Sequence, residues 1–103
     1  MEQLFVYGNL KESVIQKKVF GRIVLGVSDI LECYITSKIK IESETYPIII
    51  KRAGSSINGR VISVTSKELE LIDAYETRSY QRKKVVLKSG KEVWVYMKPR
   101  NAE

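Results

Sequence analysis

Most of this 103-residue chain consists of short runs rich in β-branched and aromatic residues, and only one stretch carries a clear helical signature. Such runs favour strands, whereas a parallel α/β sheet would require strands and helices in alternation. The sequence therefore predicts an α+β fold in a single domain over residues 1–103: a small mixed, mainly antiparallel β-barrel with one or two flanking helices. The expected strands cover residues 3–7, 22–27, 34–41, 48–50, 59–64, 80–87 and 92–97.

The helical signature begins at Thr65, which has Glu68 three residues later, the spacing of a capping box. It predicts a helix over residues 66–75 whose buried face carries Leu69, Ile72 and either Ala74 or Tyr75. Residues 11–20 can form a second, shorter helix, with one side made of Val14, Ile15, Lys18 and Val19. The small polar residues 53–58 indicate a loop, and residues 88–91 indicate a hairpin turn that uses Gly90.

The chain has no histidine and one cysteine, Cys33, which limits its possible chemistry. A cysteine nucleophile needs a base to hold it as thiolate, and a zinc site needs clustered Cys and His, so Cys33 is expected to be a small packing residue. Ser-His-Asp catalysis is excluded. Carboxylates, tyrosines, lysines and backbone amides remain as catalytic groups, and neither a metal nor an organic cofactor is expected.

Eighteen basic residues against twelve acidic ones give a net charge of +6, which suggests an anionic partner. The cations are dispersed and form no dominant tract, so a solvated surface explains them better than a nucleic-acid site. No apolar run approaches the roughly 20 residues that cross a bilayer, and the N-terminus does not resemble a signal peptide. A cytoplasmic protein without membrane contact is therefore expected.

Two features are candidates for an active site. The first expected strand ends at Tyr7-Gly8-Asn9-Leu10, where glycine permits close backbone approach and amides can face a carboxylate or a developing oxyanion, although Gly-Asn is also a common turn. The second is Glu76, which follows the predicted helix. A carboxylate there can line a pocket with a raised pKa, or be a solvated charge that the helix dipole disfavours.

These features, together with several shorter segments, resemble the γ-glutamylcyclotransferase-like family, which includes the AIG2-like proteins. The resemblance runs in order through nearly the whole chain. Its segments are Phe5-Val6-Tyr7-Gly8-Asn9-Leu10, Tyr46-Pro47, Gly59-Arg60-Val61, Leu69-Glu70-Leu71-Ile72-Asp73-Ala74-Tyr75-Glu76, Tyr80-Gln81-Arg82 and Val93-Trp94-Val95-Tyr96.

The resemblance implies a cyclotransferase that releases 5-oxoproline from a γ-glutamyl amine or amino acid. It makes Glu76 the general acid and base, and it makes Tyr7, Gly8, Asn9 and Leu10 the loop that holds the glutamyl group and the oxyanion. Tyr80 and Arg82 also match the family, although Arg82 can instead anchor the following strand by ion pairing. Tyr46 and Tyr96 are cavity candidates, although packing in the core or at the rim is the favoured interpretation for both.

One position departs from the family, which usually carries Ser or Thr where this chain has Asn9. A non-catalytic protein of the same fold that binds a small amino-acid-like ligand is therefore an alternative, and a basic nucleic-acid-binding module is a less favoured one. The sequence leaves open which amine is released and whether the protein is a monomer or a homodimer.

Overall fold

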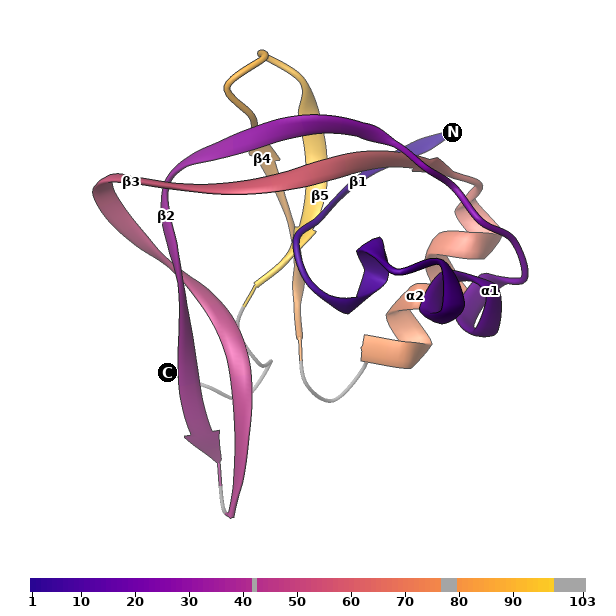
Figure 1. The fold of residues 1–103 in the computed structure, drawn as a ribbon, viewed down its shortest axis with the longest axis horizontal. Coiled ribbons are helices and arrows are strands. Elements are labelled where there is room, and N and C mark those ends of the chain that lie inside the picture. Colours follow the sequence, from indigo (N-terminus) through magenta and orange to yellow (C-terminus); the bar gives the residue numbers. More distant parts are fainter. Residues whose placement is uncertain (42, 77–79, 98–103) are drawn as a thin grey trace.

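The computed structural model describes residues 1–41, 43–76 and 80–97, apart from the side chains of residues 9, 39, 41, 46 and 47. Within these residues one five-stranded sheet has the order β2-β3-β1-β5-β4. Only the β1–β5 pair is parallel. The predicted α+β class with a mixed, mainly antiparallel, barrel-like sheet is confirmed (Figure 1). The strands are β1 (Glu2–Val6), β2 (Val27–Ile41), β3 (Glu44–Val64), β4 (Arg82–Val86) and β5 (Glu92–Tyr96).

The predicted number of strands was wrong, because β2 and β3 form one long hairpin in place of four shorter strands. The hairpin bends instead of breaking: Glu32 pairs with Ser56, but Tyr34 pairs with Lys51, so residues 52–55 form an irregularity at the corner. The expected loop at residues 53–58 thus lies inside β3, and residues 22–26 precede β2. The far half of the hairpin leaves the plane of the near half at this corner (Figure 1).

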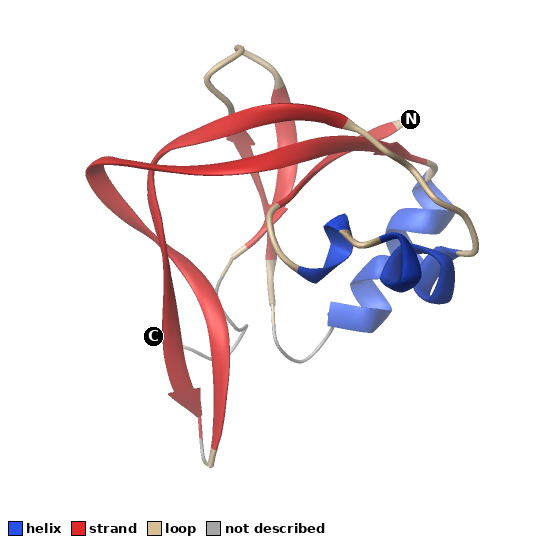
Figure 2. Cartoon of the chain, viewed as in Figure 1, coloured by secondary structure: helices blue, strands red, loops and turns tan. Residues whose placement is uncertain are grey.

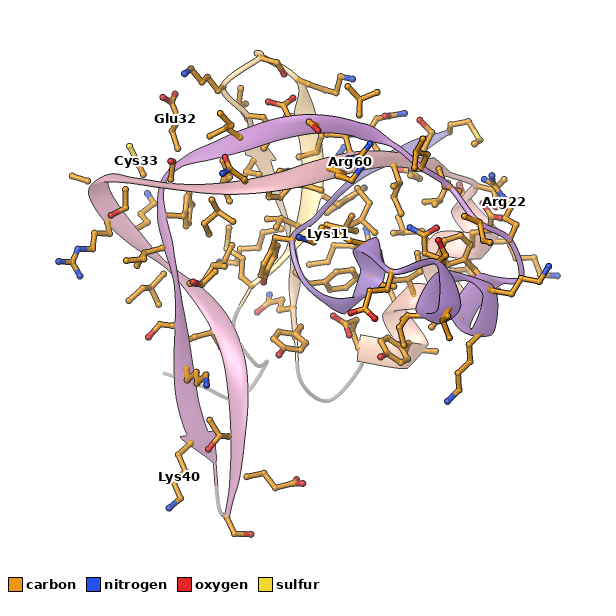
Figure 3. The ribbon with its side chains drawn as sticks, in the orientation of Figure 1. Lys11, Arg22, Glu32, Cys33, Lys40 and Arg60 are labelled. Atoms are coloured by element: carbon orange, nitrogen blue, oxygen red, sulfur yellow. The ribbon has the colours of Figure 1, made fainter. Side chains whose placement is uncertain are left out.

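Cys33 lies at the same corner, with a φ of 67° that is uncommon for a residue other than glycine. Its side chain is exposed and points away from the sheet beside Glu32 (Figure 3). The prediction that Cys33 is a packing residue was therefore wrong. In a regular strand, side chains alternate between the two faces of the sheet. The bulge at Cys33 interrupts this alternation, and the Cys33 side chain is exposed.

The helices gather on one side of the sheet (Figure 2). A short 3-10 helix, η1 (Asn9–Lys11), leads into α1 (Ser13–Phe20), and α2 (Ser66–Glu76) follows β3. The capping box is confirmed, since the Thr65 amide donates to Glu68 Oε1 over 2.9 Å and the Glu68 amide donates to Thr65 Oγ1 over 3.0 Å. Among the described helices, none is long and apolar enough to span a membrane.

The predicted buried faces of the helices were only partly correct. On α2, Leu69 and Ile72 are buried as expected, while Ala74 and Tyr75 are exposed. On α1 the buried residues are Gln16 and Phe20, whereas Val14 and Lys18 are exposed and Ile15 and Val19 are half-buried. A hydrophobicity pattern does not predict that Gln16 is buried, because glutamine is polar. Its burial is possible because its carboxamide is hydrogen-bonded: it donates to the Leu10 carbonyl over 2.8 Å and accepts from the Val24 amide over 2.7 Å.

Both faces of β1 are buried, and each faces a different apolar cluster. Leu4 and Val6 pack with residues of the helices, whereas Phe5 packs inside the curl of the sheet. Gly59 on β3 allows this arrangement. A Cβ there would lie 2.5 Å from Phe5 Cζ and 2.6 Å from the Val6 carbonyl oxygen, so only glycine fits beside the ring.

Candidate active site

The loop after β1 is held in place from both ends. At its start, the Gly8 carbonyl accepts from the Lys11 amide over 3.1 Å, which closes the η1 turn. At its end, the buried Leu10 side chain packs in the core on the helix side, and Gln16 of α1 holds the Leu10 carbonyl. The first amides of a helical turn have no partner within that turn, so this fixed loop can offer N–H groups to a ligand.

Glu76 is the last residue of α2 and is half-buried. No described residue donates a hydrogen bond to its carboxylate. Burial raises the pKa of the Glu76 carboxyl to about 7 from its ordinary value of 4.5, because an apolar environment disfavours the charged form. A carboxyl with this pKa can both take up and release a proton at neutral pH.

The loop and Glu76 meet at one pocket of about 320 Å³. Of the residues expected at the site, Tyr7, Gly8, Leu10, Glu76, Tyr80 and Tyr96 all line it. The side chains of Asn9 and Tyr46 lie outside the described part of the structure. The pocket thus joins segments that are far apart in the sequence: the end of β1, the end of α2 and the end of β5.

Tyr7 and Tyr96 are linked by hydrogen bonds that also reach α2. Tyr7 Oη donates to the Tyr96 carbonyl over 2.6 Å, and Tyr96 Oη donates to Asp73 Oδ1 over 2.5 Å. Burial is the largest cause of the raised pKa of both tyrosines, and the charge of Glu76 adds to it in each case. Both hydroxyls therefore keep their protons at physiological pH.

Arg82 lies outside this pocket lining. Its guanidinium donates to Asp73 from Nε over 2.8 Å and from Nη2 over 2.7 Å, and it stacks on the Trp94 ring at 4.1 Å from the ring centre. Of the two readings of Arg82 that the sequence allowed, the structure shows the ion pair that anchors β4. Through Asp73, this pair also fixes the helix turn that precedes Glu76.

The chain matches the family model described as "Gamma-glutamyl cyclotransferase, AIG2-like" over residues 4–103. The chain belongs to this family. It is 31% identical to AIG2-like protein C of Arabidopsis thaliana over 83 residues, 80% of this chain and 47% of that protein. AIG2-like protein D of the same plant is 29% identical over 86 residues, 82% of this chain and 55% of that protein.

The chain spans about half the length of these AIG2-like relatives. Among solved structures, a solution structure of an Arabidopsis thaliana protein covers 99% of this chain and 64% of its own, at 26% identity and a TM-score of 0.79. A structure titled "Gamma-glutamyl cyclotransferase" covers 94% of this chain and 66% of its own, at 16% identity and a TM-score of 0.73. The fold is therefore the γ-glutamylcyclotransferase-like fold.

Sequence reasoning missed several residues of this family member's pocket: Phe5, Val6, Thr36, Ile48 and Tyr75. Phe5, Val6 and Tyr75 adjoin motif residues, so their neighbourhood was a usable signal. Thr36 on β2 and Ile48 on β3 carried none, because the bend of the hairpin brings them to the pocket. Tyr75 is a large aromatic side chain that lines the pocket and is 46% exposed.

Proposed function

We propose that this protein is a γ-glutamyl amine or amino-acid cyclotransferase in which Glu76 is the general acid and base. The substrate's α-amine nitrogen attacks its γ-carbonyl carbon. The new C–N bond closes a five-membered ring, and the bond to the leaving amine breaks. The products are 5-oxoproline and a free amine, and the reaction is proposed to need no cofactor.

The observation that carries this proposal is a partly buried carboxyl with a pKa of about 7 in the pocket that the Tyr7–Leu10 loop also lines. Attack requires an unprotonated amine, so a base must first remove a proton from the α-ammonium. Glu76 performs this step and then returns the proton to the departing amine. Its raised pKa suits both transfers near neutral pH.

The loop supplies the second requirement, which is stabilisation of the tetrahedral oxyanion. Amides at Gly8 and Leu10 belong to a turn held by Gln16 and by the Lys11–Gly8 hydrogen bond, so they need little reorganisation as charge develops. The nucleophile belongs to the substrate. Folding the glutamyl chain in the pocket therefore gains effective molarity without a protein nucleophile, consistent with a chain that lacks histidine.

The test is incubation of the purified protein with a panel of γ-glutamyl amines and γ-glutamyl dipeptides, with 5-oxoproline followed by mass spectrometry. Glu76→Gln should lower turnover by roughly two to four orders of magnitude. Glu70→Gln is the matched control, because Glu70 is an exposed carboxylate on the same helix. An unchanged rate in Glu76→Gln would refute the base role, and no product from folded wild-type protein would refute the activity.

A further inference from the structure

The hydroxyl protons of Tyr7 and Tyr96 are both donated to acceptors within the protein. A phenol has one proton to donate, and its oxygen can also accept. Tyr7 Oη directs that proton to the Tyr96 carbonyl over 2.6 Å. A carbonyl cannot donate in return, so the direction of this bond is fixed and Tyr7 Oη has only lone pairs left for a ligand.

Tyr96 is in the same condition for a different reason. Its Oη donates over 2.5 Å to Asp73 Oδ1, on a carboxylate that also accepts two hydrogen bonds from Arg82. A carboxylate in such a forked pair with a guanidinium is ionised and acts as an acceptor only. Asp73 is thus a positioning residue that holds the Tyr96 proton and leaves the Tyr96 oxygen as an acceptor.

Both tyrosines line the pocket that Glu76 lines. The negative charge of Glu76 also contributes to the raised pKa of each tyrosine, after burial as the largest cause. Three groups on three elements, β5, α2 and the segment after β1, therefore offer acceptors to one space. A primary ammonium has three N–H donors and a positive charge, and it complements this set.

We propose that Tyr7 Oη, Tyr96 Oη and the Glu76 carboxylate, in its ionised form, make an acceptor-only subsite for a primary ammonium group, and that it holds the α-ammonium of the glutamyl substrate. The identity of the ammonium rests on the proposed function, whereas ammonium recognition does not. The subsite keeps the α-nitrogen beside Glu76, so the group that binds the ammonium also removes its proton.

The experiment compares the binding of L-glutamate and glutarate, which differ only in the α-ammonium, by NMR titration at pH 8, where Glu76 is mostly ionised. Neither ligand has an amine leaving group. Wild-type protein should bind glutamate at least about tenfold more tightly than glutarate, as expected for charged hydrogen bonds. Tyr7→Phe and Tyr96→Phe should each reduce this ratio to below about threefold. Tyr34→Phe, on a half-buried tyrosine outside this pocket lining, is the matched control and should keep the wild-type ratio.

A second comparison uses wild-type protein alone, so it does not depend on the folding of a variant. The N-trimethyl derivative of glutamate keeps the positive charge but has no N–H donor, and it should bind at least about tenfold more weakly than glutamate. Equal affinities for glutamate and glutarate, equal affinities for glutamate and its trimethyl derivative, or a ratio that survives in both Tyr→Phe variants would each overturn the subsite. If the ammonium preference is found but no 5-oxoproline forms, the subsite stands and the proposed reaction fails.

Discussion

Asp73 and Glu76 lie one helical turn apart on α2, but their carboxylates have opposite surroundings. Asp73 accepts two hydrogen bonds from Arg82 and one from Tyr96, while no described residue donates to Glu76. The first carboxylate is thus fixed as a charged structural group. The second carboxyl, Glu76, has a pKa that burial raises to about 7, so it can gain or lose its proton near neutral pH.

This difference predicts the pH dependence of catalysis. If ionised Glu76 is the base, kcat/KM of the proposed reaction should fall about tenfold per pH unit below pH 7, because the fraction of ionised carboxylate falls by that factor. Rates measured from pH 5 to 9 with one substrate check this limb. The residual activity of Glu76→Gln should lack it. A limb near pH 4.5 instead would mean that the working Glu76 is solvated like an ordinary glutamate.

The same carboxyl predicts how stability changes with pH. Its pKa is raised in the folded state, so its contribution is fully present below about pH 4.5 and is lost as pH rises through about 7. Glutamine resembles the protonated form at every pH. At pH 4 the free energy of unfolding of Glu76→Gln should therefore equal that of wild type. At pH 8 the variant should be more stable than wild type by about 1–2 kcal/mol, after allowance for solvent screening.

Urea unfolding at the two pH values measures this difference. Glu70→Gln serves again as the control and should show no pH-dependent gain, because Glu70 is exposed. A Glu76→Gln variant that is no more stable than wild type at pH 8 would show that the buried charge has no cost. In that case the Glu76 carboxyl would titrate near its ordinary pKa.

Local signals in the sequence were enough to identify β1 and α2. The apolar run that stops at Gly8 and the Thr65–Glu68 capping box each depend on residues a few positions apart, so their structures are settled locally. The family resemblance also predicted that the Tyr7–Leu10 loop and Glu76 belong to one site. Both parts of the pocket were therefore accessible from the sequence.

The β2–β3 hairpin was not predictable in the same way. Its continuity depends on pairing between residues such as Glu32 and Ser56, and its corner depends on a register shift around Cys33. Both are set by contacts far apart in the chain, which a local pattern does not encode. Ile48 and Thr36 reach the pocket because of this bend. Gln16 is buried where it bonds two backbone groups six and eight residues away, a pairing that helical periodicity does not reveal.

Gly59→Ala is expected to destabilise the fold. The added Cβ would meet Phe5 Cζ at 2.5 Å and the Val6 carbonyl oxygen at 2.6 Å, and the second clash is with backbone that cannot rotate away. A loss of about 2–3 kcal/mol in the free energy of unfolding is expected, typical of overpacking in a core. Urea denaturation measures it. A loss below about 0.5 kcal/mol would mean that β1 and β3 can separate at this point.

Gly8→Ala is expected to do the reverse, leaving the fold intact while weakening ligand binding. A Cβ at Gly8 meets no atom within 4 Å, and φ at Gly8 is not in the left-handed region, so stability should change by no more than about 0.5 kcal/mol.

Gly8 lines the pocket, so the new methyl group would occupy space beside the loop amides. Glutamate affinity by NMR titration and KM for the best γ-glutamyl substrate should each worsen by about tenfold or more, because a ligand can no longer approach the backbone closely. Ser56→Ala is the control, at an exposed position outside this pocket lining, and it should leave both values unchanged. Wild-type affinity and KM in Gly8→Ala would show that the glutamyl group does not contact this loop.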